Sequence, residues 1–490
     1  MSSRRLVIIG AGFAGQSLAR EIRERFPDRV LEAFWDDDPA KIGSVVDGVP
    51  VFGPISALQT HETVPDEAIL AIPSATKGQL KQIYKTVVQT GIPRIRILPA
   101  ISQIVDGEAH FVLTRDIDPQ DLLGRNPVQI SLRQSLRYLR GKRVLITGAG
   151  GSIGSELARQ LLSGGAERLY LLGHGENAIY QIDKELRLLQ AEGVGEKATI
   201  VPIVADLKDA NHLQFLLSRL KADVVFHAAA HKHVPMMEAN PVEACANNVL
   251  GTKNLLEACL EHQVKKFVLI STDKAVLPHS VYGVTKKISE DLVLEAGMRG
   301  QGQYMTVRFG NVLGSRGSIV PLFREQILAG GPVTITDPAA SRYFMTIPEA
   351  VSLVLQTGGM GQAGQLYLLD MGEPILIEDL AAQIIRFYGK EPGKDIAIQY
   401  IGLRPGERLT ERLFAPDEEP VPTAYARINR LVRATDSEIS PRQLDDLLLK
   451  LKPICVYTPD TAGQYRNRRA LRDILREFYP TLEAKNEPEF

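Results

Sequence analysis

The segment Lys142-Arg-Val-Leu-Ile-Thr-Gly-Ala-Gly-Gly-Ser-Ile-Gly154 decides the fold of this chain. Its apolar first half is typical of a buried strand, spaced glycines follow, and Ser155–Leu162 has the composition of a helix. Glycines allow a backbone to approach a pyrophosphate closely, and the start of a helix stabilises its negative charge. By itself the spacing G-x-x-G-x-x-G is equally typical of an ordinary turn. The segment therefore predicts a dinucleotide-binding unit that needs support from the rest of the chain.

A second segment, Ser271-Thr-Asp-Lys-Ala-Val-Leu-Pro-His-Ser-Val-Tyr-Gly-Val-Thr-Lys286, follows the strand-like run Lys266–Ile270. It ends in Tyr282 and Lys286, which a helix places one turn apart on the same face. We expect the lysine to favour the phenolate and to lower the pKa of Tyr282 from its usual value of about 10 toward the range of a general base. The pair predicts a site for hydride transfer.

Thr272, Asp273 and Lys274 add a hydroxyl, an acid and an amine just before this pair. A simple alcohol oxidation does not need so many acid–base groups. Asp273 and Lys274 are alternatively an ordinary surface pair after a strand. With the glycine-rich turn and the surrounding α/β pattern, the chain resembles an extended short-chain dehydrogenase/reductase.

The cofactor expected here is a nicotinamide dinucleotide. An acidic residue for the ribose 2′-hydroxyl is expected about 20 residues after the glycines. The strand-like run Arg168–Leu172 instead ends in Gly-His-Gly175, without a carboxylate, which favours NADP over NAD, with Glu176 as an alternative ribose partner. Asp206 is the expected adenine contact, or else a turn cap. The predicted cofactor-binding residues are Gly148, Gly151, Ser152, Ile153, Gly154, Asp206, Leu207, Ala228, Tyr282 and Lys286.

Composition argues against nucleic-acid binding, a cysteine metal site and a membrane span. The chain has 490 residues, enough for two or three domains, and a formal net charge of −1, which offers no electrostatic basis for binding nucleic acid or an anionic membrane. Its three cysteines show no metal-binding spacing and are expected to be reduced thiols of a cytoplasmic protein. No apolar run approaches the roughly 18 residues of a membrane span. The apolar stretch after Arg4-Arg5 is interrupted at once by glycines, so we do not interpret it as a signal peptide.

The N-terminal stretch Arg5–Arg20 repeats the pattern of Arg143–Arg159, so two nucleotide-binding-type openings lie in one chain. Alternating strand-like and helix-like segments predict two Rossmann-like, doubly wound parallel-sheet domains. We expect an N-terminal domain over 1–113, a linker over 114–140, a catalytic domain with a substrate-binding lobe over 141–435, and a helical extension over 436–490 ending in a disordered tail. Asp36 occupies the place of a ribose-binding acid in the first domain. Whether that domain binds a nucleotide or is purely structural stays open.

Four further motifs extend the likeness: Phe226-His-Ala-Ala-Ala-His-Lys-His-Val-Pro235, Val307-Arg-Phe-Gly-Asn-Val-Leu-Gly-Ser-Arg-Gly317, Phe344-Met-Thr-Ile-Pro-Glu349 and Gly402-Leu-Arg-Pro-Gly-Glu407. With the linker motif Asp121–Arg125, they resemble the polysaccharide-biosynthesis nucleotide-sugar 4,6-dehydratases, the UDP-N-acetylglucosamine 4,6-dehydratase group. Long members of that group carry membrane helices ahead of the first domain and keep the catalytic domain in the cytoplasm. No such segment stands in this sequence, so we expect a soluble form or a shortened chain, located in the cytoplasm. The resemblance also implies a homo-oligomer.

The resemblance implies a mechanism that the residue types support. Tyr282, with Thr272, removes the proton of the sugar 4-hydroxyl as hydride leaves C4. The resulting ketone makes the C5 proton acidic, Lys274 removes it, and Asp273 protonates the departing 6-hydroxyl. To act as a base near neutral pH, Lys274 needs a lowered pKa, which burial or nearby Lys286 would provide.

The UDP-sugar contacts are expected in the later part of the chain and in the His-Lys-His run. Arginine forks match diphosphate oxygens, and Glu407 is either a ribose partner or a cap for a following helix. His231 and His233 have no further ligands nearby, so no metal site is predicted. The predicted substrate-binding residues are Lys232, Asn311, Arg316, Arg404 and Glu407. Lys232 is alternatively a solvated loop residue.

Two other functions compete with dehydration. A nucleotide-sugar 4-epimerase needs Tyr282, Lys286 and the cofactor, but has no use for Asp273 and Lys274. A non-catalytic NADP-sensing protein of the same fold has no need of an intact Tyr282 and Lys286. The stereochemistry at C5 does not follow from the residues.

Overall fold

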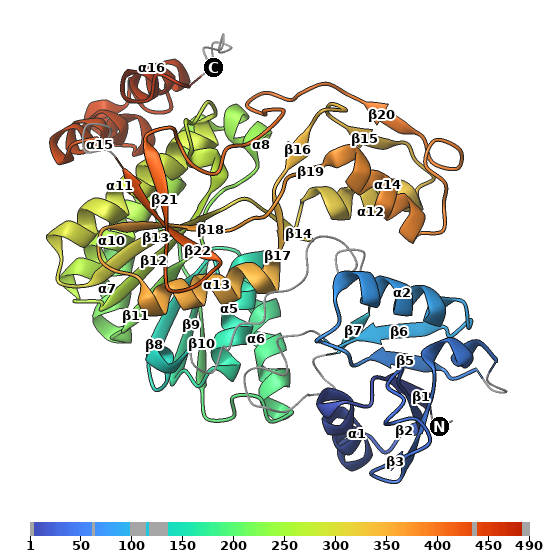
Figure 1. The fold of residues 1–490 in the computed structure, drawn as a ribbon. Coiled ribbons are helices and arrows are strands. Elements are labelled where there is room, and N and C mark those ends of the chain that lie inside the picture. The colour runs from blue at the N-terminus through green and yellow to red at the C-terminus, as the bar shows by residue number, and fades with distance from the viewer. Residues whose placement is uncertain (1–3, 61–63, 99–113, 117–135, 434–438, 483–490) are drawn as a thin grey trace. The chain divides into compact units, whose positions relative to one another are not determined.

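The computed structural model describes residues 4–60, 64–98, 114–116, 136–433 and 439–482. The chain divides into two compact units, one of residues 1–137 with 187–196 and one of 138–186 with 197–490. Each is an α/β unit built on its own sheet (Figure 1). The prediction of two Rossmann-type parallel sheets is therefore confirmed.

The first unit has a sheet in the order β3-β4-β2-β1-β5-β6-β7, parallel from β4 to β6. Its strands are β1 Arg4–Ile9, β2 Arg29–Trp35, β3 Val45–Val46, β4 Val49–Phe52, β5 Glu67–Leu70, β6 Arg94–Ile97 and β7 Arg115–Asp116. Among the described residues of this unit, the α-helices are α1 Phe13–Arg25 and α2 Lys77–Val88. Because β7 pairs antiparallel with β6, this sheet extends past residue 113, where the sequence placed the start of a linker. The motif Asp121–Arg125 and the tail 483–490 lie outside the described residues.

The second unit has a nine-stranded sheet in the order β10-β9-β8-β11-β12-β13-β18-β22-β21. Its first seven members are parallel, and β22 and β21 add an antiparallel edge. The strands are β8 Arg143–Thr147, β9 Arg168–Gly173, β10 Thr199–Val204, β11 Val224–His227, β12 Lys266–Thr272, β13 Gln303–Phe309, β18 Gln365–Leu369, β21 Glu418–Pro422 and β22 Ile428–Arg433. The central parallel strands β8, β11 and β13 are almost continuously buried, as expected where helices cover both faces.

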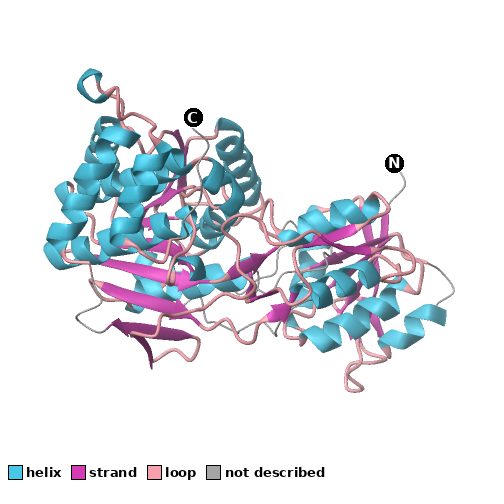
Figure 2. Ribbon diagram, turned by 90° about the horizontal axis from the view of Figure 1, so that it is seen from above, coloured by secondary structure: helices cyan, strands magenta, loops and turns pink. Residues whose placement is uncertain are grey.

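Helices cover both faces of this sheet (Figure 2). On one face α13 packs against α5, and on the other α10 packs against α7 and α11. The bounds are α5 Ser152–Ser163, α6 Glu176–Ala191, α7 Ala210–Leu220, α8 Val234–Ala239, α9 Pro241–Ala244, α10 Gly251–Glu261, α11 Val281–Arg299 and α13 Ile347–Met360. The order of the parallel strands reverses at β8, so that β8 and β11 flank the point where doubly wound sheets bind ligands beyond their carboxyl ends.

A smaller lobe is built from segments that leave the sheet after β13 and β18. Three two-stranded ladders, β14·β17, β15·β20 and β16·β19, stand there with two helices. Their bounds are β14 Asn311–Leu313, α12 Ile319–Leu328, β15 Val333–Ile335, β16 Ser341–Arg342, β17 Phe344–Thr346, β19 Ile375–Leu376, α14 Ile377–Phe387 and β20 Ile398–Tyr400.

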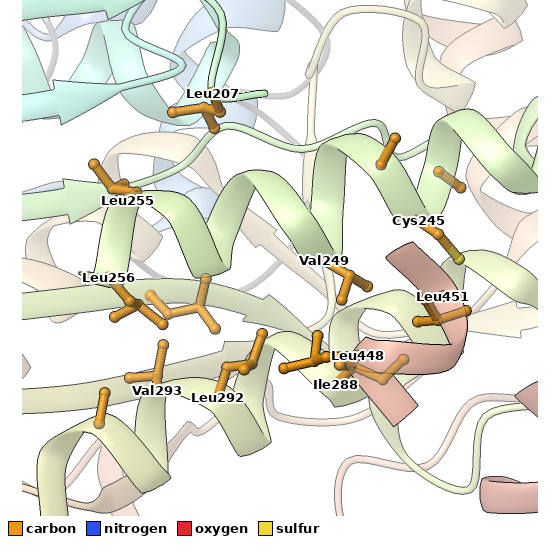
Figure 3. Close-up of a cluster of buried hydrophobic side chains, with 14 of the residues drawn as sticks. Leu207, Cys245, Val249, Leu255, Leu256, Ile288, Leu292, Val293, Leu448 and Leu451 are labelled. Carbon is orange, nitrogen blue, oxygen red and sulfur yellow. The ribbon is translucent and has the colours of Figure 1, made fainter. Parts of the chain in front are cut away.

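The C-terminal helices α15 Pro441–Cys455 and α16 Arg468–Phe478 are part of the catalytic unit's core. Figure 3 shows Leu448 and Leu451 of α15 among apolar side chains of the central helices, beside Cys245. All three cysteines are buried and free, and burial raises the pKa of each thiol. Across the part of the chain that the structure describes, no helix is both long and apolar enough to cross a bilayer.

Candidate active site

The glycine-rich turn forms a cradle with room only for glycine. Gly148 follows β8 with φ +67°, and a Cβ there would lie 2.7 Å from the backbone of Ala229. A Cβ on Gly154 would lie 2.1 Å from the carbonyl oxygen of Gly148. Helix α5 begins at Ser152, and its N-cap Gly151 offers no side chain to bond the first N–H groups. Free N–H groups at a helix start, next to a close-packed glycine loop, fit the pyrophosphate of a dinucleotide.

The other predicted cofactor residues stand at the carboxyl ends of neighbouring parallel strands. Asp206 follows β10, and its Oδ1 accepts a hydrogen bond from the backbone N–H of Lys208 at 2.9 Å. Leu207 is buried beside Gly251. Ala228 directly follows β11, and its N–H donates to the carbonyl of Thr147 at 3.2 Å. These positions lie along the edge where the doubly wound fold binds nucleotides.

Tyr282 and Lys286 lie buried on α11, whose start is capped by Ser280. The expected lowering of the tyrosine pKa is wrong. Burial raises the pKa of Tyr282 to about 12, although Lys274 and a hydrogen bond with Thr272 act in the opposite direction. Lys286 instead donates from Nζ to the carbonyl of Ile270 at 2.7 Å, and burial lowers its pKa to about 8.

Asp273 and Lys274 are no surface pair. Asp273 is buried, and its Oδ1 accepts from Lys274 Nζ at 3.0 Å and from Thr272 Oγ1 at 2.9 Å. Lys274 Nζ also donates to Asn311 Oδ1 at 3.1 Å. The structure therefore brings together four predicted residues, Thr272, Asp273, Lys274 and Asn311, beside Tyr282.

The expectation of a lowered pKa for Lys274 is also wrong. Burial lowers this pKa, but the carboxylates of Asp273 and Glu411 outweigh burial and raise it above its ordinary value. Glu411 Oε1 lies 3.6 Å from Lys274 Nζ, and the Glu411 side chain is 4 % exposed. In the resting site Lys274 is an ammonium between two buried carboxylates.

Three cationic side chains, Lys232, Arg316 and Arg404, act on one another or on His233. Lys232 Nζ donates to Ser315 Oγ at 3.3 Å, and burial together with Arg316 lowers the pKa of Lys232. Burial, Lys232 and Arg404 also lower the pKa of His233. Arg316 itself lies on the glycine-rich turn, where its guanidinium donates to the carbonyl of Gly150 and its N–H to Ser152 Oγ at 3.1 Å. Arg316 thus contacts the glycine-rich turn, a contact that the sequence did not predict.

Arg404 and Glu407 form an ion pair within one turn, with Arg404 Nη2 2.6 Å from Glu407 Oε1. Glu407 also accepts from the backbone N–H of Arg404 at 3.1 Å. No helix follows in the described stretch up to β21, so the alternative role of Glu407 as a helix cap is wrong. Of the histidines, His231 Nε2 lies 3.5 Å from Glu243, and among the described residues no group of three His, Cys, Asp or Glu is arranged for a metal ion.

Sequence reasoning missed Asn248, which lies in a π-helical turn over Cys245–Leu250. Its Oδ1 accepts from the N–H of His231 at 2.9 Å, and its Nδ2 donates to the carbonyl of His231 and to Thr285 Oγ1, both at 3.0 Å. Thr285 stands between Tyr282 and Lys286, so Asn248 joins their helix to the His-Lys-His run. Single π-turns often occur at functional sites. The available signal was the pair Asn247-Asn248 inside an apolar helix.

Glu411 and Glu238 were also missed. Both carboxylates are buried, and neither lies in one of the sequence motifs that resemble the dehydratase family. Glu238 Oε1 accepts from the N–H of Val281, the first residue of the helix that carries Tyr282, at 2.7 Å. Only the folded chain brings these side chains to the site.

Comparisons with known proteins agree with this geometry. The sequence model of a family described as "Polysaccharide biosynthesis protein" matches residues 144–433. The probable polysaccharide biosynthesis protein EpsC of Bacillus subtilis is 41 % identical over 440 residues, covering 89 % of this chain and 72 % of that protein. A UDP-N-acetylglucosamine 4,6-dehydratase (inverting) of Campylobacter jejuni is 30 % identical over 344 residues, covering 68 % of this chain and 97 % of its own.

Among solved structures, the X-ray structure of Pen from Bacillus thuringiensis is similar with a TM-score of 0.54 and 30 % identity, covering 64 % of this chain and 99 % of that one. The chain is thus related in sequence to a protein named as a nucleotide-sugar dehydratase, and it shares its fold with a solved structure. The family match spans more than half of the chain and contains the glycine-rich cradle, Tyr282 and Lys286. The chain belongs to the polysaccharide biosynthesis protein family.

Proposed function

We propose that this protein is a lyase that converts UDP-N-acetylglucosamine to a UDP-4-keto-6-deoxy-N-acetylhexosamine for the biosynthesis of a surface polysaccharide or glycan. The observation that carries the proposal is the buried contact of Lys274 with Asp273, directly beside Tyr282 and Thr272. An acid–base pair next to the hydride-transfer tyrosine is what dehydration requires beyond oxidation of C4. The relationship to a protein named as a UDP-N-acetylglucosamine 4,6-dehydratase supports the choice of substrate.

The residues divide the chemistry between them. Tyr282, assisted by Thr272, takes the proton of the 4-hydroxyl. Lys274 in its amine form takes the C5 proton. Asp273 receives the 4-hydroxyl proton from Tyr282 through Thr272, to which it is hydrogen-bonded, and donates it to the departing 6-hydroxyl, which leaves as water. Lys274 then returns a proton to C5. The bound nicotinamide dinucleotide supplies the hydride acceptor at C4 and the hydride donor at C6, so it is regenerated in each turnover.

The cradle of Gly148, Gly151 and Gly154 fits the cofactor pyrophosphate, because free N–H groups stand there and no Cβ obstructs them. NADP remains our preferred form over NAD, since β9 ends in Gly173-His174 without a carboxylate for the ribose. We assign Lys232 and Arg404, which both act on His233, to the substrate diphosphate, and Arg316, which contacts the glycine-rich turn, to the cofactor side. Asn311 orients Lys274 through its 3.1 Å hydrogen bond.

A reaction in deuterated water tests this proposal. A 4,6-dehydratase releases the C5 proton to a side chain that exchanges with solvent, while the hydrogen of C4 moves to C6. Purified protein, supplied with NADP or NAD and UDP-N-acetylglucosamine, is therefore expected to yield a product lighter by one water, with deuterium at C5 and the C4-derived hydrogen on C6. Mass spectrometry measures the loss of water, and proton NMR shows which hydrogens stand on C5 and C6.

A 4-epimerase gives a different result in the same reaction in deuterated water. Its hydride returns to C4, its product keeps the mass of the substrate, and no solvent deuterium enters carbon. An epimer of unchanged mass would overturn the roles of Asp273 and Lys274. Absence of bound or releasable nicotinamide and of any turnover would favour the non-catalytic alternative instead.

A further inference from the structure

Lys274 cannot begin the elimination as it stands in the resting site. Its Nζ is held by Asp273 Oδ1 at 3.0 Å, Asn311 Oδ1 at 3.1 Å and Glu411 Oε1 at 3.6 Å. All three partners are oxygen acceptors, which favour the ammonium form. A base, however, needs a free amine. Some nearby group therefore has to take a proton from Lys274 before the C5 proton can be accepted.

Glu411 has the surroundings of such a group. It stands in a loop whose neighbour Arg412 is exposed, yet its own side chain is 4 % exposed. Among the described residues its Oε2 is buried without a hydrogen-bond partner, and its Oε1 forms the ion pair with Lys274. Glu411 thus combines one charged partner at 3.6 Å with one carboxylate oxygen that receives no hydrogen bond from the described residues.

Asp273 differs from Glu411 in its contacts. Its Oδ1 is bonded to Lys274 and to Thr272, while its Oδ2 is buried without a partner and would lie 3.1 Å from a Cβ on Gly310. Two buried carboxylates thus share one ammonium. Transfer of a single proton from Lys274 to Glu411 leaves a neutral amine and a neutral acid in place of two buried charges, and burial favours neutral forms.

The loop that carries Glu411 is fixed to both sides of the site. Arg342 Nη1 donates to the carbonyl of Leu409 at 2.8 Å, and its Nη2 donates to that of Arg408 at 2.7 Å. Arg408 in turn donates to the carbonyl of Leu277 at 2.5 Å, in the loop between Lys274 and Tyr282. Arg342 is also the cation that acts on Lys274 from the lobe side and lowers its pKa. Glu411 is therefore held at a defined place relative to Lys274.

We propose that Glu411 is a proton-relay residue that acts through Lys274. The proposal rests on the dehydratase function proposed above. An Nζ–H bond of Lys274 breaks and an O–H bond forms on Glu411, which leaves Lys274 as an amine. That amine then takes the C5 proton, and the C5–H electron pair forms the C5–C6 double bond. The C6–O bond breaks as the hydroxyl is protonated by Asp273, which carries the 4-hydroxyl proton passed on from Tyr282 through Thr272.

The return steps restore both residues. Lys274 gives a proton to C5 as hydride reaches C6, and the acid of Glu411 gives its proton back to Lys274. Every proton is accounted for, and no reagent beyond the bound dinucleotide is needed. The 3.6 Å separation is longer than a hydrogen bond, and contacts of this kind typically tighten when the substrate binds.

The variant Glu411→Gln tests this relay, because an amide keeps the shape but does not accept the proton. With UDP-N-acetylglucosamine and dinucleotide at neutral pH, we expect elimination and deuterium entry at C5 to fall at least about 100-fold, within the usual range for an acid–base group. Oxidation at C4 does not need Glu411, so reduced-nicotinamide absorbance should accumulate in this variant. Glu419→Gln, an exposed neighbour on β21, is the matched control and should behave as wild type.

The pH profile separates a relay from a structural role. Without Glu411, Lys274 loses its proton only to solvent, so the residual elimination rate should rise about tenfold per pH unit until Lys274 is deprotonated. A merely structural defect lowers the rate by the same factor at every pH. If Glu411→Gln does not fold, Glu411→Asp replaces it, and a slower enzyme with the wild-type pH profile is expected.

The outcomes also distinguish failure of the Glu411 relay from failure of the proposed dehydratase function. A wild-type enzyme that dehydrates the sugar, together with a Glu411→Gln variant within about threefold of its rate, overturns the relay alone. A variant with an unchanged pH profile and no accumulated reduced dinucleotide does the same. A wild-type enzyme that makes no dehydrated product overturns the proposed function, and the relay with it.

Discussion

The guanidinium of Arg472 lies 3.0 Å from the carboxylate of Glu238, although 234 positions separate the two residues. Both side chains are buried. Glu238 uses its other oxygen to accept from the N–H of Val281 at 2.7 Å, next to Tyr282. Thr481, beyond the same C-terminal helix, donates to the carbonyl of Pro278 at 2.6 Å. The C-terminal segment is therefore a direct support of the catalytic loop and of the start of α11.

Replacing Arg472 by leucine should destabilise the catalytic unit strongly. Glu238 would remain buried with its charge uncompensated, and loss of one partner of a buried pair typically costs about 3–5 kcal/mol. Urea unfolding followed by intrinsic fluorescence and circular dichroism measures the change. Arg469→Leu, on the exposed side of the same helix, is the control and should leave the midpoint nearly unchanged. Equal midpoints for the two variants would contradict the supporting role of this pair.

Lys274→Ala should abolish elimination and leave binding nearly intact. General acid–base groups contribute about 10²–10⁴-fold to a rate, and we expect a loss of kcat in that range. The affinity for UDP-N-acetylglucosamine, measured by calorimetry, should change little, because the cationic group around Lys232 and Arg404 is untouched. Unchanged turnover would remove Lys274 from the mechanism.

Lys286 makes stability depend on pH in a known direction. Burial lowers its pKa to about 8, below the usual 10.5, so the unfolded chain binds more protons between these two values. The folded state therefore pays a penalty on the order of 3 kcal/mol below pH 8, and this penalty disappears as the pH rises to 10.5. Relative to Lys286→Met, wild type should gain stability across this window in urea titrations. Lys253→Met, on a half-exposed side chain, should show no such trend, and a flat difference for Lys286→Met would contradict a buried ammonium.

Gly154→Ala should prevent dinucleotide binding. The added methyl would lie 2.1 Å from the carbonyl oxygen of Gly148, so the turn that receives the pyrophosphate has to open. Gly175→Ala is the matched control, because its methyl would meet Ala178 at an ordinary 3.8 Å. The affinities of both variants for NADP and NAD are measured by titration, with quenching of protein fluorescence as the signal. Wild-type affinity in Gly154→Ala would rule out the cradle as the cofactor site.

Much of the fold was predictable because its signals are local. Apolar runs and glycine spacing identified β8, β12 and the starts of α5 and α11, and the repeated opening identified the second Rossmann-type sheet. The neighbouring residues Thr272, Asp273 and Lys274 were found for the same reason. The packing of α15 and α16 into the catalytic core was not predictable, because helical periodicity shows that a helix has an apolar face but not which surface covers it.

The charge states at the site depended on contacts between distant segments. The sequence predicted a lowered pKa for both Tyr282 and Lys274, since only their near neighbours were visible. Burial raised the pKa of Tyr282. Asp273, together with Glu411 from 137 positions further along the chain, raised that of Lys274.

The sequence by itself determined the class of fold, the place of the dinucleotide cradle and the order of catalytic residues along one strand and one helix, because these depend on local geometry and short spacings. The tertiary structure alone decided which carboxylates surround Lys274, which arginine supports Glu238 and where Arg316 lies. Those contacts join residues far apart in the chain, and the free energy of a buried charge depends on every neighbour that folding brings to it.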